Sequence, residues 1–214
     1  MTAVHRPLCS TCLRPQRTCI CQWITPTPNP LDVVILQHPL EVAHTKGTAR
    51  LLHLSLQRST LAVGETWEVG ALHALLYEPL AAVPKAQVPQ HTILLYPDSP
   101  HDPALGLSTP PPLPPALMQE PARVRLIVLD GTWRKSRKML YCNPLLQRLP
   151  RLALQDLPAS HYHIRKAQQA HQLSTLEATC MALAQLGGST APYAPLLAAF
   201  DGFVTQQQAY QAGA

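Results

Sequence analysis

Short, continuously apolar runs alternate with amphipathic stretches along this chain, and the alternation predicts an α/β domain. The runs 32–37 and 124–129 are rich in Val, Ile and Leu, as expected of strands that are buried on both faces. The runs 92–96 and 151–155 predict two further strands, whereas 72–77 is less clearly a strand. These segments are expected to form one sheet.

Four helices are predicted from capping residues and apolar spacing. They cover 48–57, 132–143, 174–186 and 194–210. Pro144 ends the second of them, because a proline disfavours helical geometry in the residue before it. Since the strands alternate with helices, the sheet should be mainly parallel and flanked by helices.

The chain divides into a small N-terminal module and a larger domain. Residues 1–24 are assigned to the module and 25–214 to the domain, whose first residues, 25–30, form a stiff proline-rich linker. A second proline-rich stretch, 100–121, is interpreted as a solvated polyproline excursion. The alternative is a docking site for a proline-reading module.

Four of the six cysteines crowd into thirteen residues of the N-terminal module. They are Cys9, Cys12, Cys19 and Cys21. Four thiolates can close a tetrahedral shell around a structural zinc, which stabilises segments too small to bury a core. Unliganded thiols or an iron–sulfur cluster remain alternatives. A catalytic zinc is disfavoured, because four cysteine ligands leave no open position.

Composition and absent motifs narrow the function. The net charge of +5 favours a polyanionic partner. No apolar run is long enough to span a membrane and no signal-peptide core is present, so a cytoplasmic location is expected. The chain lacks a GxGxxG string and a P-loop, which argues against dinucleotide and P-loop nucleotide sites. No obligate protein partner is evident.

The turn after the strand 124–129 carries the strongest candidate chemistry. Asp130 stands at the carboxyl end of this strand, the edge at which open α/β sheets bind ligands. It could act as a base or contact a ligand. Alternatively, Asp130 and Thr132 only cap the following helix, and Trp133 is only a core residue.

The helix that follows this turn is strongly basic. Its four cations fall within five residues that contain no acid: Arg134, Lys135, Arg137 and Lys138. RNA phosphates could offset their mutual repulsion, and Trp133 could stack on a base. The alternative is a solvated helix face.

Two further polar segments are site candidates. Ser174 and Glu177 have the spacing of a capping box, and the same helix start could hold an anionic group. Arg165 could bind a small carboxylate in bidentate fashion, or be an ordinary surface charge. His38 lies in a turn and is either part of a site or structural.

In combination, these strings resemble the DTW-domain family of tRNA-uridine aminocarboxypropyltransferases. The matching segments are Cys9–Cys21 with its four cysteines, Gln37–Glu41, Thr48–Leu51, Leu94–Pro97, Leu129–Trp133, Ile164–Arg165 and Leu173–Ala178. The proline-rich insert after Asp98 departs from the family's pattern.

The resemblance implies an S-adenosylmethionine-dependent enzyme with a knotted, SPOUT-like fold. It would transfer the 3-amino-3-carboxypropyl group to N3 of a tRNA uridine and release methylthioadenosine. The implied cofactor-binding residues are Leu95, Tyr96, Pro97, Leu129, Asp130, Gly131, Arg165, Ser174, Thr175, Leu176 and Glu177. The implied catalytic residues are Asp130, Thr132 and Trp133. The implied RNA-binding residues are Arg50, Arg134, Lys135, Arg137 and Lys138.

A base must accept the uridine N3 proton, and we hypothesise that Asp130 does so. One alternative is an RNA methyltransferase that uses the same cofactor. Another is a non-catalytic zinc-containing RNA-binding protein.

Overall fold

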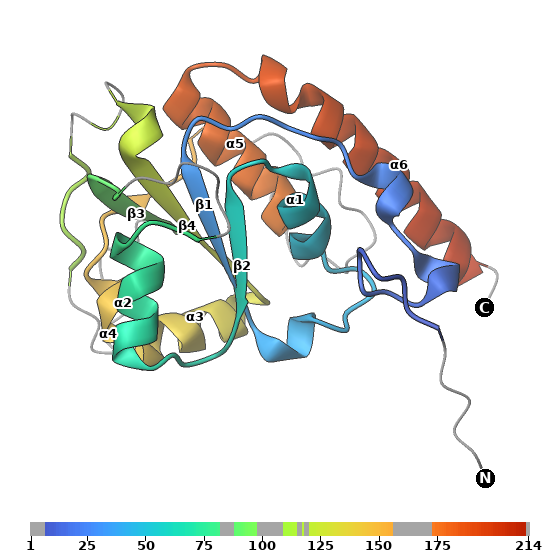
Figure 1. Ribbon diagram of the computed structural model, residues 1–214, viewed down its shortest axis with the longest axis horizontal. Coiled ribbons are helices and arrows are strands. Elements are labelled where there is room, and N and C mark those ends of the chain that lie inside the picture. The colour runs from blue at the N-terminus through green and yellow to red at the C-terminus, as the bar shows by residue number, and fades with distance from the viewer. Residues whose placement is uncertain are drawn as a thin grey trace, which may run out of the picture.

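A parallel five-stranded sheet forms the centre of the protein (Figure 1). The computed structural model describes residues 7–81, 88–97, 109–114, 117, 120–155 and 173–212. The strand order is β2-β1-β4-β3-β5, and every pairing is parallel. The strands are β1 (Asp32–Gln37), β2 (Ser59–Val63), β3 (His91–Leu95), β4 (Val124–Asp130) and β5 (Arg151–Leu152). The predicted α/β class and the parallel sheet are confirmed.

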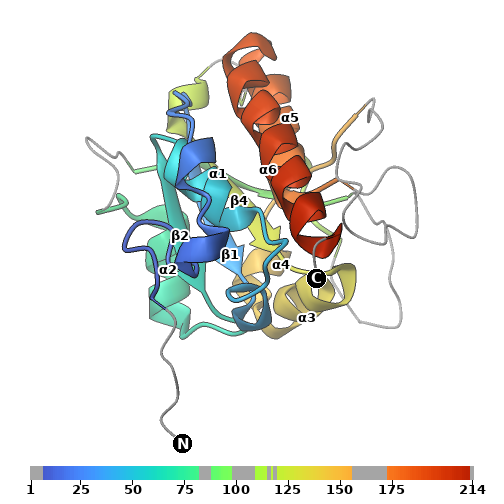
Figure 2. The same cartoon turned by 90° about the vertical axis from the view of Figure 1, so that its right-hand side faces the viewer.

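Helices cover both faces of the sheet (Figures 1 and 2). On one side lie α1 (Ala49–Ser55), α5 (Thr175–Gly187) and α6 (Ala194–Ala212). On the other lie α2 (Val69–Tyr77), α3 (Trp133–Cys142) and α4 (Pro144–Gln147). The four predicted helices are confirmed, with small differences at their ends. The path from β5 to α5 lies outside the described residues, and the knot stays a prediction.

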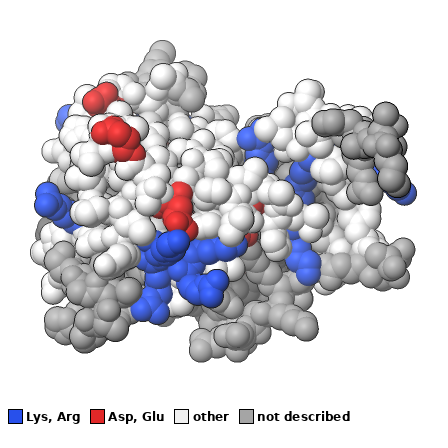
Figure 3. Space-filling view, turned by 90° about the horizontal axis from the view of Figure 1, so that it is seen from below, with Lys and Arg blue, Asp and Glu red and all other residues white. Residues whose placement is uncertain are grey.

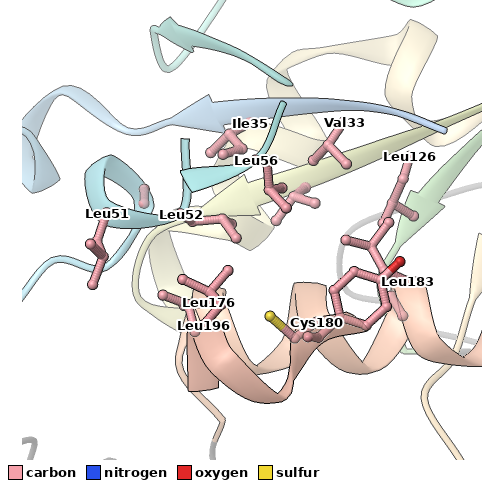
Figure 4. Packing of buried hydrophobic residues seen from close by; sticks show 14 of the residues in the cluster. Val33, Ile35, Leu51, Leu52, Leu56, Leu126, Leu176, Cys180, Leu183 and Leu196 are labelled. Atoms are coloured by element: carbon pink, nitrogen blue, oxygen red, sulfur yellow. The ribbon is translucent and has the colours of Figure 1, made fainter. Parts of the chain in front are cut away.

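Alternation along the central strands divides the core in two. Val33 and Ile35 of β1 face the first group of helices, whereas Val34 and Leu36 face the second. Figure 4 shows the first cluster, in which strand residues meet Cys180 and neighbouring leucines of α5. Burial on both faces explains why these strands read as unbroken apolar runs.

The helix at 72–77 and the edge strand β2 differ from the sequence-based expectation, and the short helix α4 was not predicted either. The run 72–77 is helical, and Glu68 caps this helix by accepting a hydrogen bond from the Ala71 N–H at 3.0 Å. The edge strand β2 was not predicted, because its half-exposed side chains leave it without a continuous apolar run.

The cysteine-bearing segment packs against α6 (Figure 1). Trp23 Nε1 donates to Gln206 Oε1 at 2.5 Å, and Gln206 Nε2 donates to the Cys19 carbonyl at 3.2 Å. Cys12 and Ile20 belong to the same buried cluster as the helices of the first group. Whether residues 1–24 form a separate domain stays a prediction.

A glycine inside α6 makes this contact possible. A Cβ on Gly202 would lie 2.1 Å from Cζ3 of the Trp23 indole, far inside van der Waals contact. Glycine costs a helix about 1 kcal/mol relative to alanine. The close approach of the indole explains why the helix carries a glycine at this position.

We therefore predict that Gly202→Ala destabilises the protein, although alanine is the better helix former. Overpacking against the indole should cost about 1–3 kcal/mol in the free energy of unfolding, measured by urea titration. Gly187→Ala is the matched control, since a Cβ there meets nothing within 4 Å. It should be neutral or stabilising. Equal effects of the two substitutions would contradict the role given to Gly202.

Candidate active site and cysteine cluster

A cavity of about 430 Å³ opens at the carboxyl ends of β3, β4 and β5, beside the start of α5. Apolar side chains make up most of its wall, and Ser136, Ser174 and Thr175 add hydroxyls. Its size is typical of small-ligand sites. The predicted residues that line it are Leu95, Tyr96, Pro97, Leu129, Gly131, Trp133, Ser174 and Thr175. The structure therefore brings the three motif-bearing turns to one place.

Several other predicted site residues, among them Leu176 and Thr132, do not line this cavity. Leu176 is fully buried in the core below α5. Thr132 is the N-cap of α3 and accepts from the Lys135 N–H at 3.4 Å. Arg165 lies outside the described residues. Ser136, which sequence reasoning missed, lines the cavity one turn into α3.

Asp130 connects three elements. Its Oδ2 accepts from Gln37 Nε2 of β1 at 2.9 Å, and its Oδ1 accepts from the Thr175 hydroxyl of α5 at 2.6 Å. The His38 N–H donates to the Asp130 carbonyl at 2.9 Å. Asp130 is only 5% exposed, and these contacts differ from the helix cap considered as an alternative. The carboxylate meets the cavity through Thr175, which lines it.

The start of α5 is held by a complete capping box. Ser174 Oγ accepts from the Glu177 N–H at 3.2 Å, while the Ser174 N–H donates to Glu177 Oε2 at 2.7 Å. The Leu176 N–H donates to Thr48 Oγ1 at 3.3 Å. The structural interpretation of the Ser174 spacing is thus confirmed. These protein contacts leave fewer first-turn N–H groups for a ligand than the sequence suggested.

An aromatic stack forms one side of the cavity. The rings of Tyr96 and Trp133 lie 5.2 Å apart with planes inclined by 12°. The Arg151 guanidinium lies 5.2 Å from the Tyr96 ring centroid, within the range of a cation–π contact. Arg151 is buried, and its Nε has no hydrogen-bond partner among the residues that the structure describes. Trp133 is 48% exposed and is therefore not a core residue.

Two lysines of α3 pair with acidic residues that are distant in the sequence. Lys135 Nζ pairs with Glu41 Oε1 at 2.8 Å, and Lys138 Nζ pairs with Glu65 Oε1 at 2.8 Å. Hydrogen bonds from Lys138 and His38 lower the pKa of Glu65. Glu41 and Glu65, which lie outside α3, therefore offset part of the positive charge of this helix. Figure 3 shows Lys and Arg side chains gathered on this side, with acidic side chains directly beside them.

Arg134, Arg137 and Lys138 share one face of α3, as their spacing predicted. With Trp133 and Tyr141 they line a second hollow of about 290 Å³. Lys135 is not part of it. Arg50 lies elsewhere, in a third hollow beside the cysteine segment, where its guanidinium donates to the Thr11 carbonyl at 3.0 Å.

His38 has a structural role. Its Nδ1 accepts from the Leu40 N–H at 3.1 Å, so the proton lies on Nε2, which donates to Glu65 Oε2 at 2.8 Å. The side chain thus holds the turn after β1 against the segment between β2 and α2.

The four N-terminal cysteines converge on one point. Their sulfur atoms all lie within 4.8 Å of one another, with Cys9 and Cys21 3.5 Å apart and Cys12 and Cys19 3.7 Å apart. Tetrahedral zinc with Zn–S bonds of about 2.3 Å holds its sulfurs roughly 3.8 Å apart. Backbone N–H groups of Cys12 and Thr11 lower the pKa of Cys9 to about 6, whereas burial raises the pKa of Cys21 to about 12. The donor set and spacing suit a metal ion of this kind.

Among the described helices, none combines the length and the apolar character needed to cross a membrane.

The sequence of this chain is similar to a known family over nearly its whole length. The DTW domain matches residues 6–208. A tRNA-uridine aminocarboxypropyltransferase 2 of Macaca fascicularis is 28% identical over 187 residues, which cover 86% of this chain and 58% of that protein. The protein of the same name from Drosophila melanogaster is 30% identical over 186 residues, which cover 85% of this chain and 67% of that protein.

A plant relative gives a similar result. The tRNA-uridine aminocarboxypropyltransferase A of Arabidopsis thaliana is 30% identical over 149 residues, which are 67% of this chain and 54% of that protein. The chain thus spans between about half and two thirds of the length of these relatives. No solved structure matches it.

Proposed function

Because this chain belongs to the DTW-domain family, we propose that it transfers the 3-amino-3-carboxypropyl group of S-adenosylmethionine to N3 of a uridine in tRNA. One observation carries the proposal. The turns after β3 and β4 and the start of α5, which bear the family's motifs, form the walls of a single cavity. The names of the relatives support the choice of reaction.

The cavity suits the proposed cosubstrate in size and chemistry. Leu95, Leu129 and Pro97 offer an apolar surface for a purine ring, and Thr175 and Ser174 offer hydroxyls for the polar amino acid end. Arg165 remains our candidate for the carboxylate of that end. When bound, S-adenosylmethionine supplies a methylene carbon activated by its sulfonium, and methylthioadenosine leaves as the new bond to N3 forms.

Asp130 is the proposed base, and the geometry suggests how the proton reaches it. Uridine N3 must lose a proton as its bond to carbon forms. Thr175 lies on the cavity wall and donates to Asp130 Oδ1 at 2.6 Å. The Thr175 oxygen takes the N3 proton while its own proton passes to Asp130. A buried carboxylate can thus act on a substrate that it does not touch directly.

We further propose that the cysteine cluster holds a structural zinc ion. Cys9, Cys12, Cys19 and Cys21 would supply all four ligands. Because the cluster packs on α6, the metal would stabilise the N-terminal segment and its docking together. The cations Arg50, Arg134, Lys135, Arg137 and Lys138 are the proposed contacts to tRNA. A tRNA substrate agrees with the cytoplasmic location expected from the sequence.

The reaction can be tested with purified protein, S-adenosylmethionine and unmodified tRNA. Mass spectrometry of the nucleosides should find 3-(3-amino-3-carboxypropyl)uridine, with methylthioadenosine formed in equal amount. Methylated nucleosides with S-adenosylhomocysteine would instead identify a methyltransferase. If tRNA binds but neither product forms, the protein is a binding protein.

The proton path predicts a large effect of one hydroxyl. Thr175→Val should lower kcat about 100-fold or more, because the relay to Asp130 is lost. Thr175→Ser is the matched control and should retain most of the activity. Asp130→Asn should also abolish turnover, with S-adenosylmethionine binding by calorimetry changed only a few-fold. A Thr175→Val enzyme that works at the normal rate would rule out the relay.

The metal proposal predicts about one zinc ion per chain by elemental analysis. Cys12→Ser should lose most of the zinc and lower Tm, because Cys12 is both a proposed ligand and a buried core residue. Cys142→Ser is the control, since Cys142 lies outside the cluster. Protein without zinc, or with the absorption of an iron–sulfur cluster, would contradict this assignment.

A further inference from the structure

The second hollow lies along one face of α3 and has no role in the chemistry above. Trp133, Arg134, Arg137, Lys138 and Tyr141 line it. At 100° per residue these five side chains fall within an arc of about 140° on the helix. We call them the Trp133–Tyr141 face. Aromatic rings mark its two ends and the cations lie between them.

The aromatic residues of this face are more exposed than packing of the fold requires. Trp133 is 48% and Tyr141 55% exposed. Other residues of the same helix already anchor it, because Met139 and Leu140 are fully buried in the second core cluster. Large exposed rings grouped on one surface indicate a binding partner.

The charge of the face indicates a polyanion. Arg134 is exposed and makes no hydrogen bond or ion pair with the described part of the chain. Lys138 remains more than half exposed despite its contact with Glu65. Cations interleaved with exposed aromatic rings are the pattern with which proteins bind single-stranded nucleic acid.

The face is continuous with the cavity. Trp133 lines both the cavity and the second hollow, and its ring is stacked on Tyr96. From Trp133 to Tyr141 the helix rises about 12 Å, so each ring offers a stacking surface of its own. A strand that leaves the cavity past Trp133 would therefore run along α3 toward Tyr141.

We propose that the Trp133–Tyr141 face binds the unpaired RNA nucleotides that directly adjoin the target uridine. Their bases stack on Trp133 and Tyr141, and their phosphates contact Arg134 and its neighbouring cations. The proposal rests on the proposed function, because that function places the uridine in the cavity. Recognition of this kind tolerates different flanking bases and weakens with salt. It defines the substrate as a tRNA segment that is single-stranded beyond the modified base.

Tyr141 gives the sharpest test because it does not line the cavity. We expect Tyr141→Ala to raise the Kd for a short uridine-containing single-stranded RNA about tenfold, measured by fluorescence anisotropy. Tyr141→Phe keeps the ring and should bind within about twofold of the unaltered protein. Arg134→Gln should flatten the salt dependence of binding, whereas Arg123→Gln, on an exposed side chain before β4, should not.

Two further measurements separate this proposal from the proposed reaction. Calorimetry should give the same affinity for S-adenosylmethionine in all these variants, and Tyr141→Ala should raise the KM for tRNA. If tRNA is modified but the Tyr141 and Arg134 variants bind RNA normally, the proposed RNA-binding role of the face is wrong and the proposed reaction holds. If the unaltered protein forms no product but the variants still lose RNA binding, the RNA-binding role of the face holds and the proposed reaction is wrong. Variants that lose affinity only for duplex RNA or anionic lipid vesicles would also overturn the single-strand assignment.

Discussion

The carboxylate of Asp130 is the contact on which the candidate site depends. It accepts from Gln37 at the end of β1 and from Thr175 at the start of α5, and it stands itself at the end of β4. These elements come from distant parts of the chain. A single buried side chain thus sets the position of the strand end and helix start that border the cavity. Hydrogen bonds to a buried carboxylate are strong enough for this role, because they are charge-assisted.

A second buried charge has a comparable position at the opposite end of the sheet. The Arg125 guanidinium contacts Asp32 Oδ2 at 3.2 Å and donates to the carbonyls of Leu75 and Glu78 at 2.9 and 2.8 Å. It thereby ties β4 to β1 and to the end of α2. Both ends of the central strand pair are therefore held by buried carboxylates.

Much of the fold was predictable because it rests on local patterns. The strand β4 is an unbroken apolar run, and Ser174 and Glu177 mark the start of α5 by a spacing with a direct physical meaning. The convergence of the motif turns also followed, since parallel strands end at one edge. The cysteine cluster was predictable from spacing alone.

Contacts between distant segments were not predictable. Lys135 and Glu41 are separated by 94 positions, so no sequence window indicates that the acid offsets the charge of α3. Arg151 looks like an ordinary surface cation until Tyr96 is seen beneath it. The edge strand β2 was not predicted, because its half-exposed positions give only a weak apolar pattern. In each case the prediction would have required contacts or burial that only the folded structure defines.

Trp133 belongs to two walls at once, the cavity on one side and the surface of α3 on the other. Two molecules that both touch one indole cannot bind independently if either shifts its ring. Thermodynamic linkage then requires the coupling to be mutual. If the bound cosubstrate changes the affinity for nucleic acid by some factor, bound nucleic acid changes the affinity for the cosubstrate by the same factor. A shared ring that shifts when either molecule binds makes the two occupancies cooperative.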